Sequence, residues 1–319
     1  MNNILSLETW TGISSTDRKT YAQRLARQLP SPFTFQSLQT YTLGEQTHEV
    51  AEFKRDNATF VLIPGGPVTL GYEADPRWEP TPEELESWNN FAKKYHITWT
   101  IREHLARATL RSRKVDLHPV LLESAAYEFY WEPMSSDDPE VQTVLKRFQK
   151  TSFSKRKTTE LNSGSIRILF DEAGETTAMQ ARSLTHGDLC KEWATRGFRL
   201  PISDEWEYAC GAASPALFRW GDHVPCDSYP INCKSWDLHL RPNAFGLLIA
   251  SNPYHGELVT EPGIWRGGDG GCTICGGAGF FLGWLTLATA YFESHASRYD
   301  ASKPLMAGYT IARRVFPLE

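Results

Sequence analysis

Hydrophobic side chains near the start of the chain recur at the spacing of an amphipathic helix. Tyr21, Leu25 and Leu29 lie four positions apart, and Pro30 follows directly. Side chains four positions apart share one face of an α-helix, and proline cannot continue a helix. The pattern predicts a packing helix over residues 16–29, and we assign residues 1–47 to an N-terminal helical arm.

Two apolar runs then predict a β-hairpin. Residues 48–53 and 59–63 are rich in strand-forming side chains, and the turn residues Asp56 and Asn57 separate them. Residues 115–127 are also apolar and typical of a strand. The first half of the chain therefore combines helices with strands.

Capping signals mark the helices expected farther along. The segment Thr81-Pro82-Glu83-Glu84 has the form of a capping box with proline at the first helical position. A second helix start lies at residues 138–139. Residues 186–194 and 204–209 complete the predicted helices, the last with Ser203 as its N-cap.

A glycine-dense segment between residues 265 and 279 contains two thiols, Cys272 and Cys275. Glycine has no Cβ, so this backbone can reach positive φ and let other atoms approach closely. Ordering so many glycines costs conformational entropy. The Cys-x-x-Cys spacing can turn both sulfurs to one side of a tight loop. Such a pair can bind a soft metal ion, cycle as a disulfide or be inert.

Composition narrows the classes of function. Hydrophobic residues make up 41% of the 319 residues, enough for a real core, and the net charge of −5 provides no basic stripe for nucleic acid. No apolar run reaches about 18 residues, and the start of the chain lacks a signal-peptide pattern. We therefore expect no nucleic-acid or membrane partner and a cytoplasmic location. Six cysteines are too few for a disulfide scaffold, and a close pair in a reducing compartment favours metal or redox chemistry.

Five motifs occur in order along the chain. They are FVLIPGGPVTLG (60–71), RLPISDEWEYA (199–209), FRWGD (218–222), PNAFGL (242–247) and WRGGDGGC (265–272). In wording and order they resemble the formylglycine-generating enzyme and sulfatase-modifying-factor superfamily. The resemblance implies an irregular α+β fold, C-type-lectin-like, with little regular secondary structure. It also implies a single domain, 1–319, with a helical insertion at about 73–114.

The same resemblance implies a copper site. In the generating enzymes, Arg-Gly-Gly-x-x-x-Cys carries the first of two copper-binding cysteines, and it matches Cys272. Their second cysteine comes five residues later, whereas here Cys275 comes three later. Thiolates select Cu(I), and the implied reactants are O2 and a thiol-containing substrate, either peptidyl cysteine or a small thiol. Asp269 replaces their serine, and it is a candidate base, a group that orients a substrate amine, or a cap of local amides.

Three further residues are candidates for the site or for a second metal. His295 is a candidate acid, base or ligand, because folding of the family type brings its segment beside the glycine-rich loop. In the family, one calcium site uses an Asn that precedes the Pro-Asn-x-Phe-Gly segment. The resemblance therefore makes Asn232 and Asp237, which precede that segment here, candidate calcium ligands, and their hard oxygen atoms suit Ca2+.

Aromatic residues flank the glycine-rich loop and are candidates for the walls of a cleft. Trp265, Trp284 and Tyr291, together with Arg298, are the expected substrate contacts, because aromatic rings give rigid amphipathic surface. Most of the aromatic side chains in this region should nevertheless be core, and residues 280–290 are apolar enough to be buried.

The leading hypothesis is a copper-dependent oxidase that acts on a thiol-containing substrate with O2. The alternative is a non-catalytic lectin-like ligand-binding module in which the thiols are incidental. A third reading is an iron-dependent sulfur-transfer enzyme, similar to the sulfoxide synthases, which requires a histidine cluster. The nearest pair, His96 and His104, lies eight positions apart and so roughly 80° apart around a helix.

Overall fold

The chain folds as a mixed α+β protein. The computed structural model describes residues 5–30, 32–74, 76–149, 160–249, 252–294 and 300–318. About 29% of the chain is helical and 27% is strand, which confirms the predicted α+β class. The prediction of little regular secondary structure was wrong, because helices and strands together make up more than half of the chain.

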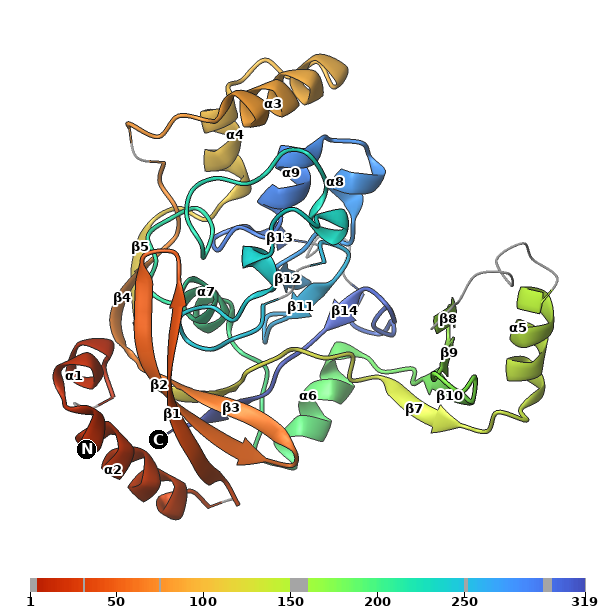
Figure 1. Cartoon of the computed structure of the whole chain (residues 1–319), viewed down its shortest axis with the longest axis horizontal. Coiled ribbons are helices and arrows are strands. Elements are labelled where there is room, and N and C mark those ends of the chain that lie inside the picture. The colour runs from red at the N-terminus through yellow and green to blue at the C-terminus, as the bar shows by residue number, and fades with distance from the viewer. Residues whose placement is uncertain are drawn as a thin grey trace.

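A five-stranded antiparallel sheet organises the body of the molecule (Figure 1). Its order is β1-β2-β3-β6-β15, formed by Thr34–Leu43, Gln46–Arg55, Ala58–Ile63, Val120–Glu123 and Val315–Pro317. The predicted hairpin is confirmed as β2 and β3, which pair across residues 56 and 57. The strand-like run predicted over 115–127 divides into two strands, broken at Pro119, which has no N–H to donate.

Both faces of the central strands β3 and β6 are buried, so these two strands are largely apolar without strict alternation. In β3, Phe60 and Leu62 contribute to one hydrophobic cluster, and Val61 and Ile63 contribute to a second cluster on the opposite face. The first cluster also contains side chains of α2 (Ser15–Gln28) and α6 (His186–Ala194), and the second contains side chains of α7 (Ser203–Gly211). Helices therefore shield both faces of the central part of the sheet from water.

The N-terminal arm is only partly helical, which corrects the prediction for residues 1–47. The helix predicted over residues 16–29 is present as α2, and α1 (Leu7–Gly12) precedes it, but Thr34–Leu43 forms the edge strand β1. Most of its side chains are exposed or half-buried, and the strand pairs on one side only. An edge strand of this kind lacks the apolar alternation by which a buried strand is recognised.

The predicted helical insertion lies between two paired strands, β4 (Gly66–Leu70) and β5 (Arg113–Leu117). It contains α3 (Pro82–Lys94) and α4 (Ile101–Ala108), and the capping box at Thr81 is present in α3. The apolar sides of both helices join a third hydrophobic cluster, which includes α9 (Phe280–Leu285). The insertion is thus packed against the segment that follows the glycine-rich loop.

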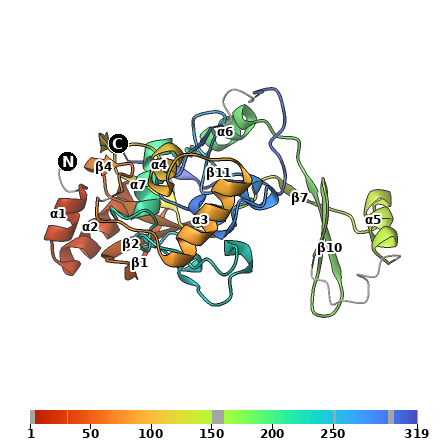
Figure 2. The same cartoon turned by 90° about the horizontal axis from the view of Figure 1, so that it is seen from above.

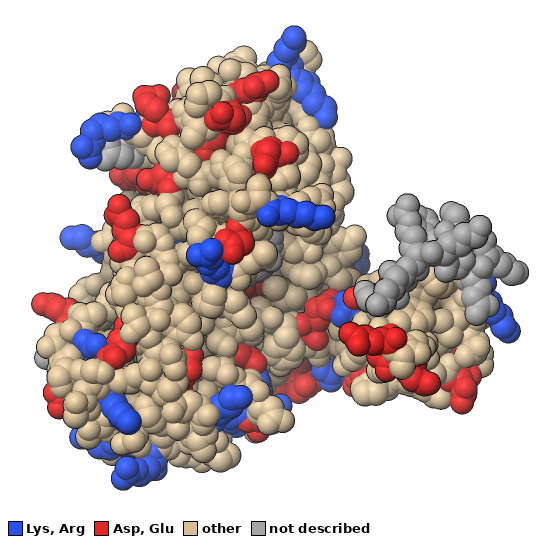
Figure 3. Space-filling view, in the orientation of Figure 1, with Lys and Arg blue, Asp and Glu red and all other residues tan. Residues whose placement is uncertain are grey.

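A separate lobe protrudes from the body (Figures 1 and 2). It contains α5 (Pro139–Gln149) and a four-stranded antiparallel sheet, ordered β7-β10-β9-β8, formed by Trp131–Met134, Thr176–Ala181, Ile166–Phe170 and Glu160–Ser163. The lobe has its own small hydrophobic cluster around Val141 and Ile168. In the face seen in Figure 3, charges of both signs are interspersed over the body, and acidic side chains gather on the lobe.

The second half of the chain carries the predicted helices α6 and α7 and a small sheet. Ser203 is the first residue of α7 and not its N-cap, which is Ile202. The backbone N–H groups of Ile202 and Ser203 are bound instead by the carboxylates of Glu205 and Glu261. The small sheet, β13-β12-β11-β14, is formed by Glu293–Ser294, Ile264–Arg266, Gly256–Leu258 and Thr310–Ile311. Among the described residues, no helix is both long enough and apolar enough to span a bilayer.

Candidate functional site

Cys272 and Cys275 begin and end a single helical turn, α8 (Cys272–Cys275), and both are exposed. Helical residues three positions apart lie on one face, with Cβ atoms about 5–6 Å from each other. A disulfide requires a Cβ separation of about 3.5–4.5 Å, so the turn must tighten before the two thiols can be oxidised to one. A metal ion between the sulfurs does not require this tightening.

The side chain of Asp269 fixes the position of the turn formed by Cys272–Cys275, which we call the thiol turn. It is 2% exposed, and its two carboxylate oxygens accept hydrogen bonds from the backbone N–H groups of Gly271 and Thr273, each at 2.8 Å. Of the roles open to it from the sequence, this geometry matches the cap of local amides. A buried carboxylate with both oxygens engaged positions the turn and is poorly placed to take a proton from a substrate.

The glycines before α8 allow the backbone to pass close to its neighbours. Gly271 has a φ of +80°, and a Cβ at this position would lie 2.1 Å from the ring of Tyr254. Gly268 is equally restricted, because a Cβ there would lie 2.3 Å from the carbonyl oxygen of His255. Close backbone approach is the reason that the glycine-rich composition is needed here.

Tyr254 is the polar neighbour of the second thiol. Its phenol oxygen lies 3.4 Å from the Sγ atom of Cys275. The hydrogen bond to Cys275, with a smaller contribution from burial, raises the pKa of the Tyr254 phenol, so the phenol keeps its proton at neutral pH. A phenol and a thiol can each donate a hydrogen bond, so this contact links Tyr254 directly to the second thiol.

The helical insertion supports the other end of the thiol turn. Lys94 donates from Nζ to the carbonyl oxygens of Gly276 and Gly277, at 2.9 and 3.3 Å, and the phenol of Tyr95 also donates to Gly276. Ser87 accepts a hydrogen bond from the N–H of Phe281, at 3.1 Å. Side chains of α3 therefore satisfy carbonyl groups that the short helix α8 leaves open.

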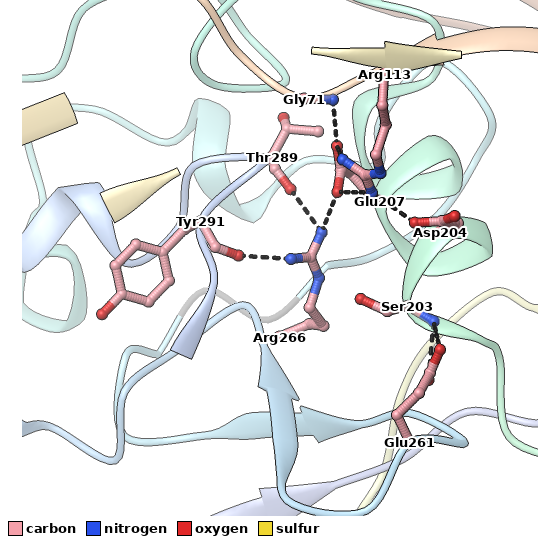
Figure 4. Close-up of polar contacts among 9 residues, drawn as sticks. All are labelled: Gly71, Arg113, Ser203, Asp204, Glu207, Glu261, Arg266, Thr289 and Tyr291. Carbon is pink, nitrogen blue, oxygen red and sulfur yellow. Dashed lines mark hydrogen bonds and ion pairs between the residues drawn. The ribbon is translucent and has the colours of Figure 1, made fainter. Parts of the chain in front are cut away.

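A buried ion-pair network anchors the loop where it leaves β12 (Figure 4). Arg266 is 0% exposed and donates to Glu207 at 2.7 Å and to the carbonyl oxygen of Tyr291 at 2.9 Å. Glu207, 1% exposed, also accepts from Arg113 at 2.9 Å and from the N–H of Gly71 at 2.5 Å. The network joins α7, β5 and β12 beneath the site.

The aromatic residues predicted as substrate contacts differ in accessibility. Trp284 is 0% exposed and donates from its indole to the carbonyl oxygen of Ser228, so it is a core residue and cannot touch a ligand in the cleft. Tyr291 is also buried, at 8% exposed. Trp265 is half-buried, and its ring lies 3.7 Å from the position that a Cβ of Gly270 would take. Of the three, Trp265 alone lies beside the thiol turn with part of its surface accessible.

Four predicted site residues remain: His295, Arg298, Asn232 and Asp237. His295 and Arg298 lie outside the described residues. Asn232 and Asp237 are both exposed, and Asp237 forms an ion pair with Arg241 at 2.9 Å. The predicted calcium site therefore has its candidate ligands on the surface, where Asp237 is engaged with a cation of the chain itself.

The histidines considered for iron are also dispersed. His104 packs against the ring of Trp88 at 4.8 Å, and burial lowers its pKa from 6.5 to about 4. His96 is exposed, with a φ of +55°. Within the described residues, no group of three or more His, Cys, Asp or Glu side chains is arranged to hold a metal ion.

Comparison with protein-family models and with curated proteins found no match for this chain. The resemblance noted in its motifs therefore remains a prediction. Sequence reasoning did not identify Tyr254, Lys94 or Tyr95, which contact the thiol turn from other segments. The only available signal was the glycine content, which indicated that some group must approach the loop closely without indicating which one.

Proposed function

We propose that the chain is an oxidoreductase that binds Cu(I) through Cys272 and Cys275 and uses O2 to oxidise a thiol-containing substrate. The observation that carries the proposal is the pair of exposed thiols on one face of a single helical turn. The C-type-lectin-like fold and the peptidyl-cysteine or small-thiol substrate enter as parts of the same proposal, supported by the five motifs.

The donor set fits a soft monovalent ion. Two thiolates select Cu(I), whereas a structural zinc site takes four ligands. When bound, Cu(I) supplies redox chemistry toward O2 that thiols and phenols lack. The chain itself contributes the thiol of Cys275 in contact with the phenol of Tyr254, a turn fixed by Asp269, and the partly exposed ring of Trp265 as a surface for substrate.

The first test is titration of reduced protein with Cu(I) in the presence of a competing chelator. We expect one tightly bound copper per chain. Cys272→Ser and Cys275→Ser should each lose more affinity than the roughly 10- to 100-fold typical of removing a supporting residue. Cys233→Ser is the matched control, because that half-buried thiol contacts Ser235 and lies outside the turn.

A second measurement separates metal binding from turnover. Oxygen uptake by the copper-loaded protein is followed with a cysteine-containing peptide and with N-acetylcysteine, for wild type and both variants. Uptake that requires both thiols supports the oxidase. A Cys275→Ser protein that retains copper and turnover overturns the assignment, and failure of the wild type to bind copper favours the non-catalytic binding module.

A further inference from the structure

A large cavity lies between the N-terminal arm and the body, away from the thiol turn. Its volume is about 830 Å3, within the range of about 300–1,000 Å3 that small-molecule sites occupy. One wall is formed by α1, a second by β4, and a third by the chain that follows α7. In Figure 1, α1 and β4 lie on the opposite side of the molecule from α8.

The backbone at one wall of this cavity is strained. Ala212 and Ala213 have φ values of +47° and +66°, a left-handed conformation that is unfavourable for a residue with a Cβ. The Nε2 atom of His48 donates to the carbonyl oxygen of Ala212 at 3.1 Å and helps to hold it. Strain of this kind is concentrated at functional sites, and Ala213 and His48 both line the cavity.

The charges that line the cavity are acidic. Glu8 and Glu73 lie at its rim, both are exposed, and neither has an ion-pair partner among the described residues. Glu207 forms part of the floor, but Arg266 and Arg113 balance its charge. No lysine or arginine is among the described residues that line the cavity. Burial lowers the pKa of His48, which keeps its ring neutral at neutral pH.

The rest of the lining combines apolar surface with hydroxyl groups. Leu7, Val68 and Leu70 provide hydrocarbon. Tyr208 and Thr289 are 3% and 8% exposed, and their hydroxyl oxygens have no hydrogen-bond partner in the described part of the chain. A buried polar group without a hydrogen-bond partner destabilises the fold. A ligand that supplies hydrogen bonds to these residues therefore gains affinity.

We propose that this cavity is a binding site for a small organic cation that carries an amine beside a hydrocarbon group. The acidic rim attracts the ammonium group, and the apolar wall accepts the hydrocarbon. The site is independent of the proposed copper chemistry, since it shares no residue with the thiol turn.

The test compares three probes of similar shape and different charge: phenethylamine, 2-phenylethanol and 3-phenylpropanoate. Binding to the full chain is measured by isothermal titration calorimetry at low and high salt. We expect phenethylamine to bind most tightly and to lose affinity as salt rises. Equal affinity for the neutral alcohol, tighter binding of the carboxylate, or binding of none of the three overturns the proposal.

Substitutions then locate the binding. Glu8→Gln and Glu73→Gln should each weaken phenethylamine binding by about two- to fivefold, as expected for one exposed charge, and Glu172→Gln on the protruding lobe is the matched control. Thr69→Trp in β4 should block the cavity, while Thr177→Trp in β10, also an exposed strand threonine, should not. Cys272→Ser should bind phenethylamine as the wild type does, even if copper binding fails. Unchanged binding in Thr69→Trp places the amine elsewhere and refutes the assignment.

Discussion

Replacing Glu207 with glutamine should destabilise the fold strongly, because it removes the charge that balances a fully buried arginine. Arg266 is 0% exposed, and Glu207 is the carboxylate with which it forms an ion pair, at 2.7 Å (Figure 4). Glutamine has nearly the same shape but only one acceptor oxygen for the donors of Arg266, Arg113 and Gly71. Removing one partner of a buried pair costs about 3–5 kcal/mol. For a chain of this size, with an unfolding entropy of about 2.1 cal/mol/K per residue, that corresponds to a fall in Tm of about 4–8 °C.

The matched control is Glu261→Gln. Glu261 is half-buried, and among the described residues its carboxylate accepts only from the backbone N–H of Ser203. Loss of its charge should therefore cost about 1 kcal/mol or less. Both variants are compared with wild type by urea unfolding followed through tryptophan fluorescence and by thermal melts, with circular dichroism to establish that each is folded. If the free energy of unfolding falls equally in the two variants, the argument that Arg266 needs this counter-charge is wrong.

Two further predictions concern protonation and thiol reactivity. Because burial lowers the pKa of His104 to about 4, the unfolded chain takes up a proton that the folded chain does not, and stability should fall as pH drops from 6.5 toward 4. Urea unfolding of wild type and His104→Gln at several pH values isolates the contribution of His104 to this pH dependence. If the free energy of unfolding depends on pH equally in both proteins, the prediction is contradicted. Iodoacetamide should modify exposed Cys272 and Cys275 before Cys210 and Cys226, whose thiol pKa values burial raises to about 11 and about 12. Peptide mapping by mass spectrometry follows the order, and early labelling of Cys210 contradicts it.

The elements that could be predicted from the sequence are those with strong local signals. The capping box at Thr81 and the turn residues Asp56 and Asn57 placed a helix and a hairpin correctly. The edge strand β1 was missed because its side chains meet water on much of their surface. Ser203 was taken for a cap because serine commonly serves as one, whereas two glutamate carboxylates perform that function.

The candidate site was predictable only in its local part. The spacing of Cys272 and Cys275 was enough to place both thiols on one side of a turn. The contacts that hold the turn come from Tyr254 and from Lys94 of the insertion, and no periodicity in the sequence relates such distant segments. Trp284 was wrongly predicted as a substrate contact. Aromatic side chains occur both in cores and in binding clefts, and the sequence alone does not distinguish the two, because burial depends on tertiary packing.

The position of β15 in the central sheet has a consequence for how the chain folds. Val315 pairs with Leu122, so the strand beside β6 comes from a distant, late part of the sequence. Closing so long a loop costs conformational entropy before the contacts between the two strands form and stabilise the pair, and this slows folding. While the chain is being synthesised, β6 presents an apolar, unpaired edge until residues 315–317 emerge from the ribosome. This interval is when the protein depends most on protection from aggregation.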